Sequence, residues 1–243
     1  MVLKSDIVPQ GEDKEWTYLG RVLRQAGGSL SLRMSEAYAS ELCSELKLSG
    51  KGSDSIPDLQ RSDQAEELDA GRYRLYRHCV GIVMWLSNER PDLLYATRQF
   101  DLSSPTVDDW ENLRRVGRYL LRFPARSIEF VPRGGLPVVR DTPKARLRVD
   151  AFSDSNWANK STSGWVVYVE RMPVAWGCRR QQAVAISSCE AEYYAASVCV
   201  AEQIHVSEII EEISGHGKVV ATIPQGTRQE ELQETWLRST SNT

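Results

Sequence analysis

The sequence has few of the residues that hold structural zinc. Its five cysteines contain no Cys-x-x-Cys pair, and only three histidines, at positions 78, 205 and 216, occur in 243 residues. A structural zinc site needs four such ligands at close spacing, so the pattern argues against one. An odd number of scattered cysteines also favours a reduced, intracellular chain, in the cytoplasm or nucleus, over a disulfide-rich secreted one.

Long apolar runs and a strong net charge are missing too. The longest apolar run, "CVGIVMWL" at 79–86, is about half of what crosses a bilayer, and the first ten residues lack a signal-peptide pattern. We therefore expect no membrane association. The formal net charge is −3, so any nucleic-acid partner would have to be bound by a local basic patch.

The first half shows mainly helical patterns after a short β-hairpin. Alternating residues around Gly27 and Gly28 predict two strands within 16–34, and Ser35 follows as a helix N-cap. Residues 49–71 resemble an exposed loop, and the apolar stretch 74–89 predicts a buried helix. A helix restarts at Pro91, and 106–123 opens on a capping-box-like pair, Thr106 and Asp109.

The second half predicts strands followed by a long helix. Alternation predicts three strands, at 145–154, 163–170 and 172–178, joined by short turns as an antiparallel meander. Residues 183–188 fit a short strand or an extended entry into a helix. The helix itself is predicted over 188–213, capped by Ser188 with Glu190 in its first turn. "KVVATI" at 218–223 fits a further strand.

Two carboxylates stand out in this half. Asp154 ends the first strand, and Glu192 lies one turn into the long helix. If that helix packs beside the strand, the two side chains could share a divalent cation, since Mg²⁺ prefers oxygen ligands. From spacing alone the alternative is that both are solvated surface residues.

A family resemblance is visible in the same region. "SDSNWA" and "KSTSGWVVYVERMPVAWGCRRQQAVAISSCEAEYYAAS" resemble the ribonuclease H domain of copia-type LTR retrotransposon Pol polyproteins, with its SDxDWA strand end, KSTSG hairpin and EAEY helix entry. Upstream, "YLGRVLRQAGGSLSLRMSEAYASELCSEL" and "LYRHCVGIVMWLSNERPDLLYATRQFDLSSPTVDDWENLRRVGRYL" resemble the segment that connects the polymerase to ribonuclease H in the same polyproteins.

The resemblance implies a fold, a reaction and a metal. The fold would be α+β or α/β. A mainly helical connection-like segment would occupy 1–131, followed by a linker at 132–145 that is rich in proline and glycine. A partial ribonuclease H-like mixed sheet with a long helix would follow at 146–217, and a divergent tail at 218–243. The family reaction is Mg²⁺-dependent cleavage of RNA in RNA–DNA hybrids. Asp154 and Glu192 match two of the four metal-binding carboxylates.

The chain also departs from the family pattern. Asn156 replaces the second acid of SDxDWA, and no Asp follows Asp154, where the family has a third and a fourth carboxylate. With two of four carboxylates, we expect a C-terminally incomplete domain with little or no nuclease activity, because losing one catalytic group commonly costs about a hundredfold or more.

Several basic and polar side chains are candidates for contacting nucleic acid. Arg114, Arg118 and Arg122 recur every four residues along one helix face, which could follow a phosphate backbone or be a solvated face. Around the strands, the candidates for binding a hybrid are Lys160, Ser161, Arg179, Arg180 and Gln181; a polar hairpin explains them nearly as well. Trp157, Trp165 and Trp176 fit packing better than base stacking.

The sequence therefore predicts a Pol polyprotein fragment with impaired ribonuclease H-like activity. Other fragments of such a polyprotein are possible partners. Two alternatives stay open: a non-catalytic remnant that binds nucleic acid, and a relic without function that folds marginally.

Overall fold

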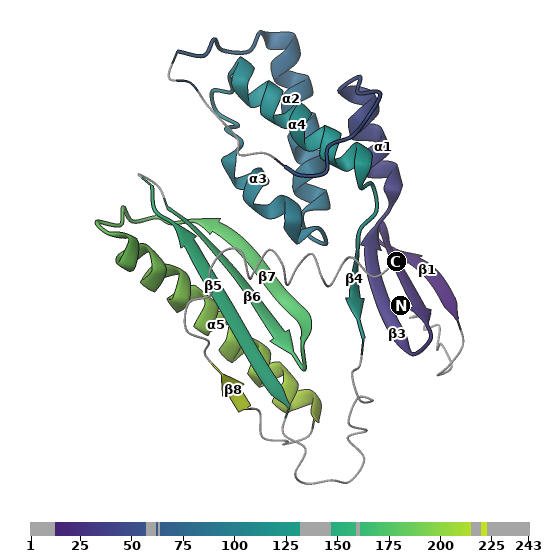
Figure 1. The fold of residues 1–243 in the computed structure, drawn as a ribbon, viewed down its shortest axis with the longest axis vertical. Coiled ribbons are helices and arrows are strands. Elements are labelled where there is room, and N and C mark those ends of the chain that lie inside the picture. The colour runs from purple at the N-terminus through teal and green to yellow at the C-terminus, as the bar shows by residue number, and fades with distance from the viewer. Residues whose placement is uncertain are drawn as a thin grey trace, which may run out of the picture.

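The computed structural model describes residues 13–56, 62, 64–131, 147–158, 161–214 and 220–222. The described chain is mixed α+β, as expected, with two four-stranded sheets (Figure 1). The predicted linker at 132–145 lies outside the described residues, as does the tail at 218–243 except for 220–222. No helix in the described part is long and apolar enough to cross a bilayer.

The first sheet is antiparallel, in the order β1-β2-β3-β4. Its strands are β1 (Lys14–Tyr18), β2 (Arg21–Ala26), β3 (Ser29–Met34) and β4 (Ser127–Phe130). Gly27 and Gly28 join β2 to β3 with φ of 56° and 80°, values that glycine adopts without strain. The hairpin β2–β3 confirms the predicted strand pair, whereas β1 and β4 were not predicted.

The helices of the first half pack around one apolar core. They are α1 (Glu36–Glu45), α2 (Ala70–Leu86), the 3₁₀ helix η1 (Pro91–Leu93), α3 (Leu94–Gln99) and α4 (Val107–Arg122). The core is formed mainly by aliphatic side chains that are almost completely buried, among them Leu42, Leu46, Val83, Leu86, Leu113, Val116 and Leu120. Burial of each such side chain contributes about 1.5–3 kcal/mol, which favours this arrangement over isolated helices.

Local capping signals in this half are confirmed. The Ser35 hydroxyl accepts a hydrogen bond from the Ala37 N–H at 3.4 Å, as an N-cap does. At the start of α4, the Asp109 carboxylate accepts from the Thr106 N–H at 2.8 Å, and the Thr106 hydroxyl accepts from the Asp109 N–H at 3.5 Å. These reciprocal bonds form the predicted capping box, with Asp in the place of Glu.

The second sheet has the order β7-β6-β5-β8. β5 (Arg148–Asn156), β6 (Thr162–Val169) and β7 (Met172–Arg180) form the predicted antiparallel meander, and β8 (Val220–Thr222) pairs with β5 in parallel. The long helix α5 (Ser188–Ser214) covers one face of this sheet (Figure 1). Val149, Ala151, Val167 and Cys199 are buried between the sheet and the helix.

Two details of the second half differ from expectation. Residues 183–187 form an irregular entry into α5, so the alternative of a short strand there is wrong. The cap of α5 is one residue earlier than predicted: the Ser187 hydroxyl accepts from the Glu190 N–H at 3.1 Å, and Ser188 is the first helical residue. Sequence patterns commonly misplace helix ends by a residue or two, because several hydroxyl residues here are adequate caps.

The two halves meet where η1 and α3 pack against the second sheet. α3 contacts β7 on the face of the sheet opposite α5. The Arg98 guanidinium donates to the Cys178 carbonyl at 2.8 Å, and the Trp176 indole N–H donates to the Asn88 carbonyl at 3.1 Å. The second sheet is therefore covered by a long helix on one face and by a short helical segment on the other.

Candidate functional site

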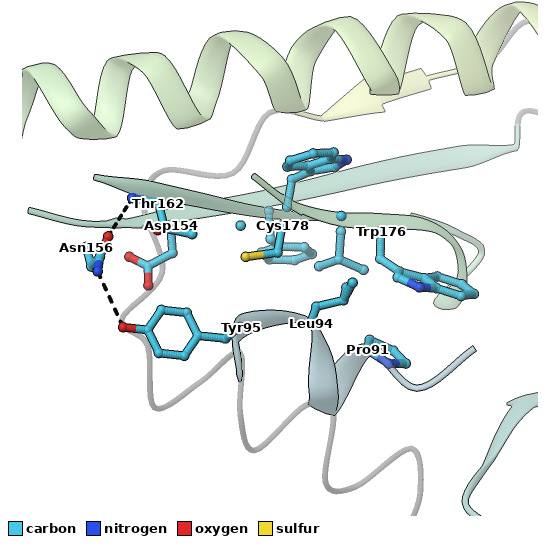
Figure 2. A pocket seen from close by; sticks show the side chains of 13 residues that line it. Pro91, Leu94, Tyr95, Asp154, Asn156, Thr162, Trp176 and Cys178 are labelled. Carbon is cyan, nitrogen blue, oxygen red and sulfur yellow. Dashed lines mark hydrogen bonds between the residues drawn. The ribbon is translucent and has the colours of Figure 1, made fainter. Parts of the chain in front are cut away.

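The alternation of β5 decides which way Asp154 faces. Val149 and Ala151 pack against α5, so the side chains of Phe152, Asp154 and Asn156 belong to the opposite face. Asp154 pairs with Gly164 of β6, which pairs with Cys178 of β7. Figure 2 shows the carboxylate of Asp154 pointing away from α5 and toward Tyr95 of α3.

A pocket of about 170 Å³ lies on this face, between the sheet and the η1–α3 segment. One wall consists of Pro91, Leu94 and Tyr95 from the helical half. The other wall is formed by the three strands and includes Phe152, Asp154, Asn156, Trp165, Val166, Trp176 and Cys178. Figure 2 shows Leu94 and Tyr95 facing the strand residues across the opening. The site thus combines elements that are far apart in the sequence, such as Tyr95 and Asn156, which are separated by 61 residues.

Asp154 is the one acidic residue among the described residues that line the pocket, and no basic residue lines it. Partial burial raises the pKa of the Asp154 carboxyl, and the nearby charge of Glu192 raises it further, while the Ser155 backbone N–H opposes the shift. Within the part of the chain that the structure describes, no Lys or Arg pairs with this carboxylate. A negative charge here therefore lacks a compensating cation.

Glu192 reaches the end of β5 from α5. Its Oε1 accepts a hydrogen bond from the Ser155 N–H at 3.3 Å, so the predicted proximity of Glu192 and Asp154 is present in the structure. The two carboxylates approach from opposite faces of the sheet, since Asp154 points into the pocket and α5 covers the other side. Glu192 is itself exposed.

The residues present do not fit a two-metal centre. Two bridging ions need several fixed carboxylates, and no group of three or more possible metal ligands of the Asp, Glu, His or Cys types occurs among the described residues. The rest of the pocket wall near Asp154 is largely aromatic and aliphatic. Among the described residues, Asp154 and Glu192 are therefore the two carboxylates that this end of β5 brings together.

Asn156, the residue that departs from the SDxDWA pattern, links the two halves. Its Oδ1 accepts from the Thr162 N–H at 2.6 Å, and its Nδ2 donates to the Tyr95 hydroxyl at 3.4 Å (Figure 2). An amide can donate and accept at once, so both polar atoms of this side chain have partners.

The predicted hybrid-binding residues of the hairpin have different environments. Ser161 is fully buried and its hydroxyl bonds to the backbone of Ala158. Gln181 donates from Nε2 to the Ser163 hydroxyl and to the Ala191 carbonyl, both at 2.9 Å, and so ties β6 to the first turn of α5. Arg179 and Arg180 are exposed, and Arg180 donates to the Arg98 carbonyl at 3.0 Å. Lys160 lies outside the described residues.

The arginine stripe on α4 is partly engaged within the chain. Arg114 donates to the Leu46 carbonyl at 2.8 Å, at the C-terminal end of α1. Arg122 forms an exposed ion pair with Asp54 at 3.1 Å. Arg118 is exposed, and its side chain pairs with none of the described residues. A role of this stripe in binding phosphate stays a prediction.

Sequence reasoning missed the helical wall of the pocket. Leu94 and Tyr95 belong to a short helix with no motif of its own, and the interpretation of Trp176 as a packing residue did not indicate what it packs against. The polar contact of Tyr95 with Asn156 spans 61 residues, and no local pattern reports such a pairing. The sequence offers one weak signal, a tyrosine four residues after the helix-initiating Pro91.

Comparison with known proteins shows similarity over more than half of the chain. The chain is 33% identical over 145 residues to the retrovirus-related Pol polyprotein from transposon RE2 of Arabidopsis thaliana, and 30% identical over the same length to that from transposon RE1. Each match covers 57% of this chain and 9% of the relative. The secreted RxLR effector protein 161 of Plasmopara viticola is 33% identical over 138 residues, which are 53% of this chain and 89% of that protein.

The chain is similar to part of the retrovirus-related Pol polyproteins from transposons. The predicted relationship to retrotransposon Pol polyproteins is thereby confirmed. The chain spans about a tenth of the length of the Pol polyproteins that it matches. No protein-family model matches the chain, and no solved structure matches it.

Proposed function

We propose that the chain is a copia-type Pol segment, a connection-like part joined to a ribonuclease H-like sheet, in which hybrid cleavage is lost or strongly impaired. The observation that carries the proposal is that the Asp154 and Glu192 carboxylates both lie near the Ser155 N–H. Among the described residues, no third metal-binding side chain joins them. The strand order and the long helix α5 on one face are compatible with a ribonuclease H-like sheet.

Within this proposal Mg²⁺ would be held weakly. Asp154 and Glu192 offer oxygen ligands, and a bound divalent ion would relieve the repulsion that raises the pKa of Asp154. The residues that this chain supplies would position at most one ion, whereas the family reaction depends on two.

The test is cleavage of a labelled RNA–DNA hybrid by the purified chain with and without Mg²⁺. Asp154→Asn and Glu192→Gln serve as matched controls that remove one charge each at constant size. We expect no metal-dependent products above background from any of the three proteins. Cleavage by the unmodified chain that disappears in both variants would overturn the proposal and show that further ligands complete the site.

A second candidate function is binding of an RNA–DNA hybrid or another nucleic acid without cleavage. Arg118 and Arg179 favour it, because both guanidinium groups are exposed and neither pairs with another described residue. Binding through phosphate contacts would weaken steeply with salt. Arg118→Gln together with Arg179→Gln should reduce the affinity and flatten the salt dependence, measured by fluorescence anisotropy; an unchanged salt dependence would exclude these two residues as phosphate contacts.

A further inference from the structure

We propose that the pocket between the second sheet and the η1–α3 segment binds a small organic monocation of the alkylammonium type, with Asp154 as its counter-charge. This goes beyond the function proposed above and rests on the pocket's geometry, whether or not hybrid cleavage occurs. The shared chemistry is a primary ammonium group on an aliphatic chain, either a free amine or a lysine side chain.

The charge of the pocket argues for a cation. Asp154 is the single charged residue among the described lining residues, and it is about half buried without a cationic partner. The Arg98 guanidinium donates to the Cys178 carbonyl at 2.8 Å, and Arg98 does not line the pocket. Burial raises the pKa of the Cys178 thiol to about 11, so this group adds no charge at neutral pH. A carboxylate in such a site is stabilised by an incoming positive group.

The walls of the pocket favour an organic cation over a metal ion. Tyr95, Phe152 and Trp176 contribute aromatic rings, whose faces attract a cation that carries its own apolar body. Mg²⁺ demands six oxygen ligands in near-octahedral geometry, and this wall supplies mainly carbon. Glu192, the second carboxylate, approaches from the α5 side and does not line the pocket.

Size and hydrogen-bonding capacity select an ammonium group. The volume of about 170 Å³ is below the roughly 300–1,000 Å³ of pockets for drug-sized ligands, so only a short chain fits. The Asn156 amide is already bonded to Thr162 and Tyr95. The acceptors left include the Asp154 carboxylate, the Tyr95 oxygen and the Thr162 hydroxyl, three groups that match the three donors of an ammonium better than the five of a guanidinium.

The experiment titrates the chain with n-butylammonium chloride, with 1-butanol as its uncharged isostere and sodium chloride as the ionic-strength control. Trp176 lines the pocket, so tryptophan fluorescence reports occupancy, and calorimetry gives the affinity independently. We expect saturable binding of butylammonium and an affinity for 1-butanol that is at least about tenfold lower. Equal binding of the two probes would overturn the proposal.

Three variants locate the site. Asp154→Asn should weaken butylammonium binding about tenfold or more at unchanged size. Gly164→Val should block binding sterically without a change of charge, because a Cβ at Gly164 meets only the Asp154 carbonyl oxygen, at 4.0 Å, and the added methyl groups enter the pocket. Glu192→Gln should change the affinity less than about threefold, since this carboxylate is outside the pocket. Circular dichroism and a cooperative melt establish that each variant is folded.

Competition with Mg²⁺ and a second ligand complete the test. Mg²⁺ would be held at most weakly by Asp154, so at equal concentration and matched ionic strength it should not displace butylammonium; displacement under these conditions, in the unmodified chain or in Glu192→Gln, would overturn the proposal in favour of a metal site. Nα-acetyl-lysine methylamide presents the same head group on a peptide backbone. Tighter binding of this compound than of butylammonium supports a lysine side chain as the occupant, and the reverse supports a free amine. Hybrid cleavage is measured from its RNA products and butylammonium binding from fluorescence and calorimetry. The proposed function and the proposed amine site can therefore fail independently of each other.

Discussion

At the scale of single residues, the helical half depends on a buried charge network. Arg90 is only 2% exposed, and its Nε and Nη2 donate to the Asp92 carboxylate at 2.9 and 2.7 Å. Its Nη1 donates to the Phe123 carbonyl at 2.9 Å, and the Tyr119 hydroxyl donates to Asp92 at 2.7 Å. The network fixes the start of η1 against the end of α4. The η1–α3 segment forms one wall of the pocket.

Arg90→Met should therefore destabilise the chain by about 1–3 kcal/mol, because it leaves the partly exposed Asp92 carboxylate without its cation and the Phe123 carbonyl without its donor. Urea unfolding at neutral pH measures the loss. The control is Arg122→Met, which removes the exposed pair with Asp54 and should cost less than about 1 kcal/mol. Similar losses for both variants would show that the Arg90 network contributes no more than a surface pair.

The two aspartates of these sites respond to pH with opposite signs. Burial alone would raise the pKa of Asp92, but the charge and hydrogen bonds of Arg90 and the Tyr119 hydroxyl hold it below its ordinary value. Its stabilising contribution is present above pH 3.8 and is lost as the pH falls through the folded-state pKa. The pKa of Asp154 is raised, chiefly by burial and then by Glu192, so its ionisation costs stability as the pH rises above 3.8.

Asp154→Asn should consequently stabilise the chain at pH 7, since the amide avoids a partly buried, uncompensated charge. The gain should shrink as the pH falls and vanish near pH 3, below the ordinary pKa of 3.8, where the native carboxyl is protonated too. Chemical unfolding of both proteins at several pH values gives this curve. A gain that is the same at pH 3 and pH 7 would point to a packing effect in place of the charge.

At the scale of elements, the second sheet contains one very close approach. Trp165 of β6 lies over Gly177 of β7, and a Cβ at Gly177 would meet the Trp165 ring at 2.1 Å. The ring lies between the sheet and the α5 core, against which Trp165 packs. The absence of a side chain at position 177 therefore lets this strand pair accept a large aromatic residue.

Gly177→Ala should destabilise the chain by about 1–3 kcal/mol through overpacking against this ring. The matched control is Gly81→Ala in the middle of α2, where an added Cβ meets nothing within 4 Å. Alanine there should stabilise the helix by about 0.5–1 kcal/mol. Thermal and chemical unfolding should show a lower free energy of unfolding for Gly177→Ala and a higher one for Gly81→Ala. A lower value for Gly81→Ala would contradict the open space that the structure has around Gly81.

Elements with local signals were predictable from the sequence, and those defined by distant partners were not. The capping box at Thr106, the hairpin around Gly27 and the meander of β5–β7 depend on residues a few positions apart. β4 was missed because its partner β3 lies nearly a hundred residues earlier, at Leu30–Arg33. Among the candidate site residues, Asp154 and Glu192 do approach one another, whereas the helical wall of the pocket depends on tertiary packing that no periodicity records.

At the scale of the whole molecule, a small set of hydrogen bonds joins the two halves. Arg98 contributes its side chain to Cys178 and its carbonyl to Arg180, and Trp176 reaches the Asn88 carbonyl. These bonds surround the packing of α3 on β7 and border the pocket. The mutual orientation of the halves is therefore coupled to the shape of the pocket.

Combining Arg98→Met with Trp176→Phe should loosen this junction. We expect calorimetry to resolve two unfolding transitions in place of one, because each half has its own apolar core. Arg77→Met, on the outer surface of α2, serves as the control and should leave the transition unchanged. A single sharp transition in the double variant would show that other contacts hold the halves together.

The amide of Asn156 has a consequence for the valence of the ion that the pocket can neutralise. Asn156 lies two residues from Asp154 on the same face, where the family pattern has a second acid. A carboxylate at this position would keep both hydrogen bonds, since the Thr162 N–H and the Tyr95 hydroxyl can each donate to it. The walls would stay in place while the formal charge doubled. Two negative charges balance a divalent ion, and one balances a monovalent ion. The Asn156 Nδ2, in the place of a carboxylate oxygen, therefore makes the pocket neutral with a monovalent cation instead of a divalent one.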